Sequence, residues 1–129
     1  MLAIDTNVVV RYLVGDHPAQ SAKARKLIDG TDIFVCTTVL LETEWVLRSV
    51  YGFESAQIAK TLAAFAGLPR VTLQDAALTA RALACIPKGL DFADALHLLQ
   101  SEGCGEFVSF DKRFVETANR LGEIPVRTL

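Results

Sequence analysis

The sequence predicts an α/β protein, a three-layer sandwich with a mainly parallel central sheet. Short apolar runs of strand length alternate along the chain with longer segments of helical periodicity. A helix between successive strands lets those strands run parallel, with helices on both faces of the sheet. The chain has 129 residues, of which 51% are hydrophobic and 22% charged, a composition typical of globular proteins. We therefore predict one domain that spans residues 1–129.

In the first part of the chain, the predicted strands rest on apolar runs and the predicted helices on caps and glycine stops. Gly15, Gly30 and Gly52 follow three of the helical segments. We expect strands at 1–4, 32–36 and 70–73, and helices at 8–13, 18–28, 39–51 and 55–66. Thr6 or Asn7 is expected to cap the first of these helices, and Thr37 or Thr38 the third.

The rest of the chain continues the alternation. An alanine-rich segment predicts a helix that ends near Pro87, and Gly103 follows a further helical segment. We expect helices at 75–85, 91–102 and 112–121, a strand at 107–110 and an edge strand at 126–129.

Acidic side chains lie where the predicted strands end and the following helices begin. Asp5 follows the first strand, and Asp111 follows the fourth. Asp94 lies in the first turn of its helix, and Glu42 about one turn into the helix after the second strand. Ligands of open parallel sheets bind beyond the carboxyl ends of the strands. The sequence therefore predicts that four carboxylates from four segments converge on one edge.

Converging carboxylates repel one another unless they take up protons or bind a cation. Mg²⁺ prefers oxygen ligands and usually keeps several waters. A metal ion lowers the pKa of such a water and neutralises charge on a phosphodiester. These properties favour a metal-dependent hydrolase.

Each acid also has a purely structural interpretation. Asp91 and Asp94 have the spacing of a capping box, and Asp5 and Asp111 stand where turn or N-cap residues are common. Glu42 lies among apolar residues, so we expect it to be partly buried and in need of a partner. Glu44 is expected to be solvated or paired with Arg48 one turn away.

Four motifs in this order resemble the PIN-domain family, and more closely its VapC-type toxins of toxin–antitoxin pairs. The motifs are Leu2-Ala-Ile-Asp-Thr-Asn7, Leu41-Glu-Thr-Glu-Trp-Val-Leu-Arg48, Asp91-Phe-Ala-Asp-Ala-Leu96 and Ser109-Phe-Asp-Lys-Arg-Phe114. Each motif alone is weak, but the ordered set covers nearly the whole chain and is specific.

The resemblance implies a PIN-like sandwich with an Mg²⁺ or Mn²⁺ site built from Asp5, Glu42, Asp94 and Asp111. It further implies cleavage of single-stranded or looped RNA, such as tRNA. Attack by a metal-bound hydroxide would leave a 5′-phosphate and a 3′-hydroxyl. The resemblance also implies a homodimer and a cognate antitoxin protein as partners. Four further residues match positions beside the site, where they would orient a carboxylate or a water: Thr6, Asn7, Asp91 and Ser109.

The net charge of −2 argues against a generic nucleic-acid coat, so any contact with RNA must be local. Arg11, Lys112 and Arg113 lie close to the acidic motifs and are candidate RNA contacts, although ordinary solvated surface is the alternative for each. The three cysteines lack metal-ligand spacing, and no segment resembles a signal peptide or membrane span. We expect a cytoplasmic protein.

Two other functions stay open at this point. A phosphatase with an aspartyl-phosphate intermediate would use Asp5 as nucleophile, but that class requires a second Asp where this chain has Asn7. A non-catalytic protein-binding domain would use the acids only as helix caps. Stabilisation by Mg²⁺ would argue against the second alternative.

Overall fold

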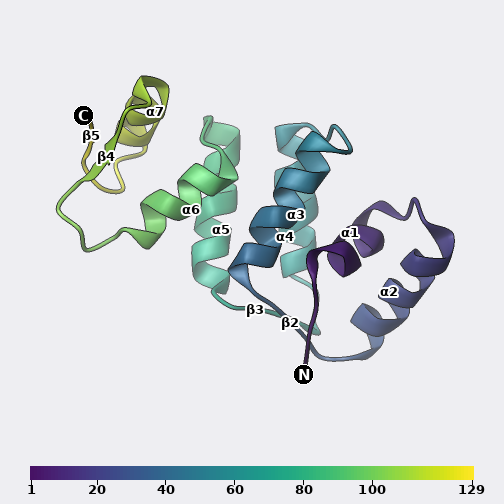
Figure 1. Ribbon diagram of the computed structural model, residues 1–129. Helices are drawn as coiled ribbons and strands as arrows, with labels where there is room; N and C mark the ends of the chain where they lie inside the picture. The colour runs from purple at the N-terminus through teal and green to yellow at the C-terminus, as the bar shows by residue number, and fades with distance from the viewer. The chain divides into compact units, whose positions relative to one another are not determined.

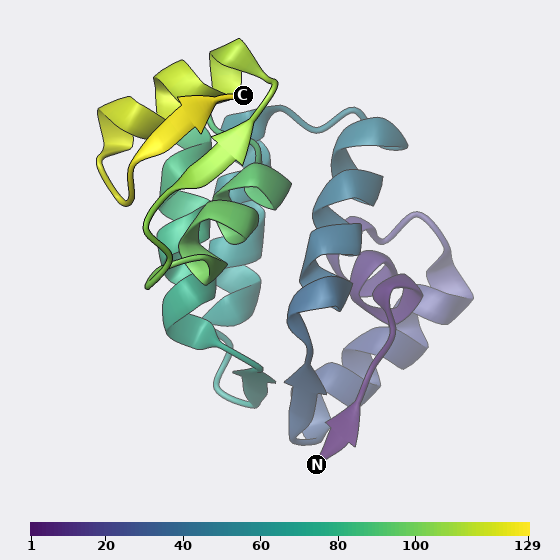
Figure 2. The same cartoon turned by 60° about the vertical axis from the view of Figure 1, so that its left-hand side comes forward.

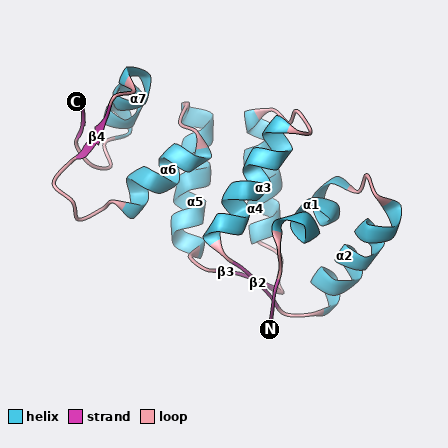
Figure 3. Cartoon of the chain, in the orientation of Figure 1, coloured by secondary structure: helices cyan, strands magenta, loops and turns pink.

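The computed structural model describes all residues from 1 to 129, and its contacts group them into two units, 1–76 and 77–129. Every strand pair is parallel, and helices connect the strands, as predicted for an α/β protein. The strands are only two or three residues long, so helices dominate the ribbon (Figure 3). The parallel strands form two sheets, one in each unit.

In unit 1, three strands form a sheet of order β1-β2-β3, with Leu2 opposite Ile33 and Ile33 opposite Val71. Helices α1 and α2 connect β1 to β2, and α3 and α4 connect β2 to β3 (Figure 1). Helix α1 packs against both α2 and α3. The bounds are β1 Leu2–Ala3, α1 Thr6–Val14, α2 Pro18–Gly30, β2 Ile33–Val35, α3 Thr37–Ser49, α4 Ser55–Ala66 and β3 Val71–Leu73.

The core of unit 1 follows the apolar periodicity of the sequence. Ile58, Leu62 and Phe65 recur at helical spacing in α4, and all three are buried. Leu40 and Leu47 of α3 are buried as expected, whereas Val50 at its C-terminal end is exposed. Residues of β2 add a further apolar layer because both Ile33 and Val35 are fully buried. A packed apolar interior therefore fixes the edge of the sheet at which β1 and β2 end and α1 and α3 begin.

In unit 2, two parallel strands, β4 and β5, lie side by side with α7 packed against them (Figure 2). Asn119 of α7 fixes β5 because its carboxamide bonds both the N–H and the carbonyl of Val126, at 3.1 and 2.9 Å. The bounds are α5 Ala76–Cys85, η1 Ile86–Lys88, α6 Phe92–Gln100, β4 Phe107–Ser109, α7 Lys112–Leu121 and β5 Val126–Thr128. The expected edge strand at the C-terminus is thus confirmed.

Helix ends show where the predictions were right and wrong. Gly15 and Gly122 end α1 and α7 in the left-handed region, at φ 73° and 72°, which glycine adopts without strain. The expected cap at Thr6 or Asn7 was wrong, because Asp5 occupies the N-cap of α1. The cap at Thr37 or Thr38 was also wrong: Cys36 holds that position in α3, without a side-chain hydrogen bond. None of the helices combines the length and apolar composition that a membrane-spanning helix needs.

Candidate metal centre

Asp5 stands at the carboxyl end of β1. The N–H of Ile4 donates to the carbonyl of Phe34 at 3.3 Å, which extends the parallel pairing up to the residue before Asp5. The Asp5 carboxylate then accepts the N–H of Thr6 at 2.8 Å as α1 begins. Asp5 itself is exposed. It therefore has one oxygen tied to the backbone and further lone pairs open to a ligand.

Two of the predicted neighbours of Asp5 also lie at the start of α1. The Thr6 side chain is 6% exposed, and its hydroxyl has no hydrogen-bond partner. Asn7 is exposed and forms part of the wall of a pocket between α1 and α2.

Glu42 lies in the second turn of α3, which begins immediately after β2. Since β1 and β2 are parallel, α1 and α3 start at the same edge of the sheet. The prediction that Glu42 is partly buried was wrong, because its side chain is exposed. An exposed carboxylate at this edge can bind a cation without the cost of burying a charge.

The buried acid of α3 is Glu44 instead. Its carboxylate is only 5% exposed, and it accepts from Arg48 Nε at 3.0 Å. Of the two alternatives expected for Glu44, solvation or pairing with Arg48, the structure shows the pairing. Helical geometry explains both results, since residues two apart point to different sides of a helix and residues four apart meet.

We expect Arg48→Gln to lower the free energy of unfolding by about 1–2 kcal/mol, because it leaves a buried carboxylate without its cation. Urea denaturation at neutral pH measures the loss. Arg70→Gln is the matched control. Arg70 pairs with Asp32 at 3.3 Å, and their side chains are 49% and 64% exposed. An exposed pair is worth ~0–1 kcal/mol, so the control should lose less. Equal losses would contradict the role of burial.

Unit 2 brings three of the predicted acids within electrostatic reach of one another. Asp94 lies in the first turn of α6, and its carboxyl group is about half-buried. Burial raises the pKa of that carboxyl above its ordinary value, the Asp91 carboxylate raises it further, and Asp111 acts in the same direction. His97 opposes these effects. Unit 2 therefore holds a concentration of negative charge around Asp94.

The capping interpretation of Asp91 and Asp94 does not hold for their side chains. Asp91 occupies the N-cap of α6, yet its carboxylate caps no backbone N–H. Neither acid forms an ion pair. Two carboxylates that satisfy no backbone donor and meet no cation are free to take a metal ion.

Asp111 follows β4 and begins α7. Its carboxylate accepts the N–H of Phe114 at 3.1 Å, so the N-cap interpretation is correct for this residue. The hydroxyl of Ser109 accepts the N–H of Asp111 at 3.0 Å. Ser109 therefore fixes the backbone of the acid, which suits its predicted position beside the site.

The donor set fits a hard divalent cation. All the candidate ligands offer carboxylate oxygens, and Mg²⁺ is usually held by one or two carboxylates together with several waters. In neither unit do three or more His, Cys, Asp or Glu side chains lie close enough together to hold a metal by themselves. That the acids of both units serve one ion stays a prediction.

The candidate RNA contacts fall into two kinds. Arg11 is held by the protein: its guanidinium donates to Gln20 at 2.7 Å, to Tyr51 at 3.3 Å and to Asp16 at 3.4 Å. Lys112 and Arg113 are exposed at the start of α7, directly after Asp111. Their contact with RNA stays a prediction.

The chain was compared with known proteins. No curated protein matches it. The sequence profile of the PIN domain matches residues 2–120, which includes every acid described above. The chain therefore belongs to the PIN domain family, whose members are generally nucleases that depend on a divalent metal such as Mg²⁺.

Proposed function

We propose that this protein is an Mg²⁺-dependent endoribonuclease that cuts single-stranded or looped RNA and acts as the toxin of a toxin–antitoxin pair. The observation that carries the proposal is the environment of Asp94. Its half-buried carboxyl lies near the carboxylates of Asp91 and Asp111, and it forms no ion pair. A protein gains no stability from such an arrangement unless a cation joins it.

The residues of the chain would share the work as follows. Asp94 and Asp111 would offer carboxylate oxygens to the ion, and so would Asp5 and Glu42. Bound Mg²⁺ supplies a Lewis acid that lowers the pKa of water and neutralises charge on the phosphodiester. The Ser109 hydroxyl keeps Asp111 in position by accepting the backbone N–H of Asp111. The backbone N–H of Thr6 positions the Asp5 carboxylate by donating to it.

RNA as substrate and a role as toxin are supported by the resemblance of the four motifs to VapC-type toxins. The same resemblance supports an antitoxin and a second copy of the chain as partners, and Mn²⁺ as an alternative ion. The non-catalytic alternative assumed that the acids only cap helices. The carboxylates of Asp91 and Asp94 cap no backbone N–H, which weakens that alternative.

The direct test is metal removal. Purified protein is treated with EDTA, and total cellular RNA is then added with or without excess Mg²⁺. We expect discrete cuts only with Mg²⁺, and new ends that accept adaptor ligation directly because they carry a 5′-phosphate. Single-stranded DNA serves as the comparison substrate and should stay intact.

Two outcomes would overturn the proposal. Cleavage that persists in EDTA and leaves cyclic phosphates would indicate a metal-free ribonuclease. No cleavage by a folded protein, together with a melting temperature that Mg²⁺ does not change, would favour a non-catalytic domain, because a ligand that binds the folded state must stabilise it.

A further inference from the structure

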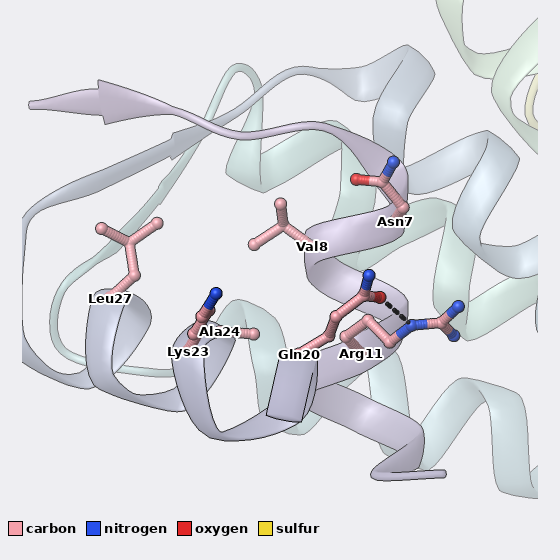
Figure 4. Close-up of a pocket in the computed structure, with 7 residues that line it drawn as sticks. All are labelled: Asn7, Val8, Arg11, Gln20, Lys23, Ala24 and Leu27. Carbon is pink, nitrogen blue, oxygen red and sulfur yellow. Dashed lines mark hydrogen bonds between the residues drawn. The ribbon is translucent and has the colours of Figure 1, made fainter. Parts of the chain in front are cut away.

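A pocket of about 470 Å³ lies between α1 and α2 in unit 1 (Figure 4). This volume falls within the range of ~300–1,000 Å³ that is typical of small-molecule sites. Val8, Ala24 and Leu27 form its apolar surface. The polar part of the lining consists of Asn7, Arg11, Gln20 and Lys23, with no acid among them.

The hydrogen bonds of Arg11 make one wall of this pocket rigid. Gln20 of α2 accepts from Arg11 Nε at 2.7 Å, so the bond joins the two helices across the pocket (Figure 4). Tyr51 and Asp16 hold the other end of the guanidinium, and the Tyr51 hydroxyl donates to Asp16 at 2.8 Å. Arg11 therefore shapes the pocket, and nearby Asp16 offsets its charge.

The remaining polar groups are free to bind a ligand. Lys23 is exposed and forms no ion pair, so its ammonium group is the unpaired cation of the pocket. Gln20 uses its carbonyl oxygen on Arg11, which leaves its amide hydrogens available. Figure 4 shows Lys23 and Gln20 on α2 and Asn7 at the start of α1, and all three belong to the lining of the pocket.

The chemistry of these groups selects an anionic ligand with a flat apolar part. An ammonium group binds phosphate as a point charge. Carboxamides of Asn and Gln form hydrogen bonds to the edges of bases, and single-stranded RNA is recognised through such edges and through base contacts with side chains. One nucleotide provides both parts, a phosphate and a base.

Helix α1 connects this pocket directly to the candidate metal centre. Asp5 caps the helix, and Asn7 in its first turn lines the pocket. A chain of nucleotides that passes Asp5 therefore meets the pocket within one or two turns of α1.

We propose that the α1–α2 pocket binds one nucleotide of the RNA substrate, with its phosphate on Lys23 and its base over Val8, Ala24 and Leu27, where Asn7 and Gln20 contact the base edge. This inference rests on the proposed ribonuclease function and gives that function a subsite for its substrate. In this arrangement Arg11 forms part of the pocket wall and does not bind the phosphate.

The test is binding of a labelled single-stranded oligoribonucleotide in EDTA, so that no cleavage occurs, followed by fluorescence anisotropy over a range of salt concentrations. Lys23→Gln is expected to weaken binding about tenfold, the equivalent of one charge-assisted hydrogen bond. It should also lower the slope of log affinity against log salt by about 0.7, the loss of one phosphate contact with a single strand.

Lys26→Gln is the matched control, since Lys26 is an exposed lysine of the same helix that does not line the pocket. It should keep nearly full affinity. A second measurement titrates the four nucleoside monophosphates into the wild-type protein and follows amide NMR shifts. The largest shifts are expected at Val8, Lys23, Ala24 and Leu27.

The outcomes separate this inference from the function on which it rests. Mg²⁺-dependent RNA cleavage with equal affinities of Lys23→Gln and Lys26→Gln, or with nucleotide shifts confined to other residues, would overturn the pocket and leave the ribonuclease intact. Absence of both cleavage and oligonucleotide binding would overturn the ribonuclease as well.

Discussion

Asp94→Asn is expected to lower RNA cleavage by at least about 100-fold while the protein stays folded. Loss of a residue that only supports a metal ligand already costs ~10–100-fold, so loss of a ligand should cost more. The amide keeps the shape of the side chain but removes the charge that a cation needs. Asp94 is half-buried in the first turn of α6, so the substitution removes a charge that is only partly screened by solvent.

The same substitution should not destabilise the metal-free protein. Burial and the neighbouring carboxylates raise the pKa of Asp94 in the folded state. A group whose pKa is higher in the folded state than in the unfolded state destabilises the fold when it is ionised, as it becomes with rising pH. A neutral amide avoids that cost, so the melting temperature in EDTA should match or exceed that of the wild type. Added Mg²⁺ should then raise the melting temperature of the wild type more than that of the variant.

The measurement compares 5′-phosphate RNA ends in cells that briefly express the wild type or the variant. Discrete new ends should appear only with the wild type. Glu116→Gln, which neutralises an exposed acid of α7 outside the group around Asp94, is the control and should cut like the wild type. Identical end profiles for the wild type and Asp94→Asn, with both proteins folded, would count against the nuclease proposal.

Phe65→Ala is expected to have the largest effect on stability, a loss of about 3–5 kcal/mol in the free energy of unfolding. Phe65, in the last turn of α4, is 2% exposed and meets Tyr12 edge-on, with ring centroids 6.0 Å apart. The change removes the apolar contacts and leaves a cavity that rigid helices cannot close. Domains of this size are typically stable by only about 5–15 kcal/mol, so a large share would be lost.

Urea unfolding followed by circular dichroism measures this loss. Phe110→Ala is the matched control, because Phe110 is 76% exposed and its removal should change the stability by less than about 0.5 kcal/mol. A similar loss for both variants would mean that burial in α4 does not govern the stability of the chain.

Much of the fold could be predicted because its signals are local. Glycine adopts a positive φ without strain and therefore commonly ends a helix, as Gly15 and Gly122 do. Apolar spacing in α4 identifies its buried face without knowledge of its neighbours. For α1 the sequence offered Asp5 as an alternative cap to Thr6 or Asn7, and Asp5 is the N-cap. The cap of α3 was missed because β2 ends at Val35 and leaves the next residue, Cys36, in an extended conformation, which places the helix start one residue earlier.

Some features of the candidate site could likewise be predicted from local sequence, and others depend on how the helices pack. The position of Asp94 in the first turn of a helix follows from sequence, and so does that of Asp111 after a strand. Which acid of α3 is buried depends on how α3 faces α1 and α4, so the sequence suggested Glu42 and the buried residue is Glu44. Lys23 and Gln20 could not be singled out, because the pocket they line exists only once α1 and α2 pack together.

Helix α1 joins the candidate metal ligand Asp5 at its N-cap to Val8, which lines the pocket proposed for the base. Three residues of α-helix rise about 4.5 Å, and a helix neither stretches nor bends easily over so short a length. The bound base and the cleaved phosphodiester bond would then lie a fixed distance apart. Cuts would fall at a constant number of nucleotides from the base that the pocket accepts, whatever the sequence between them.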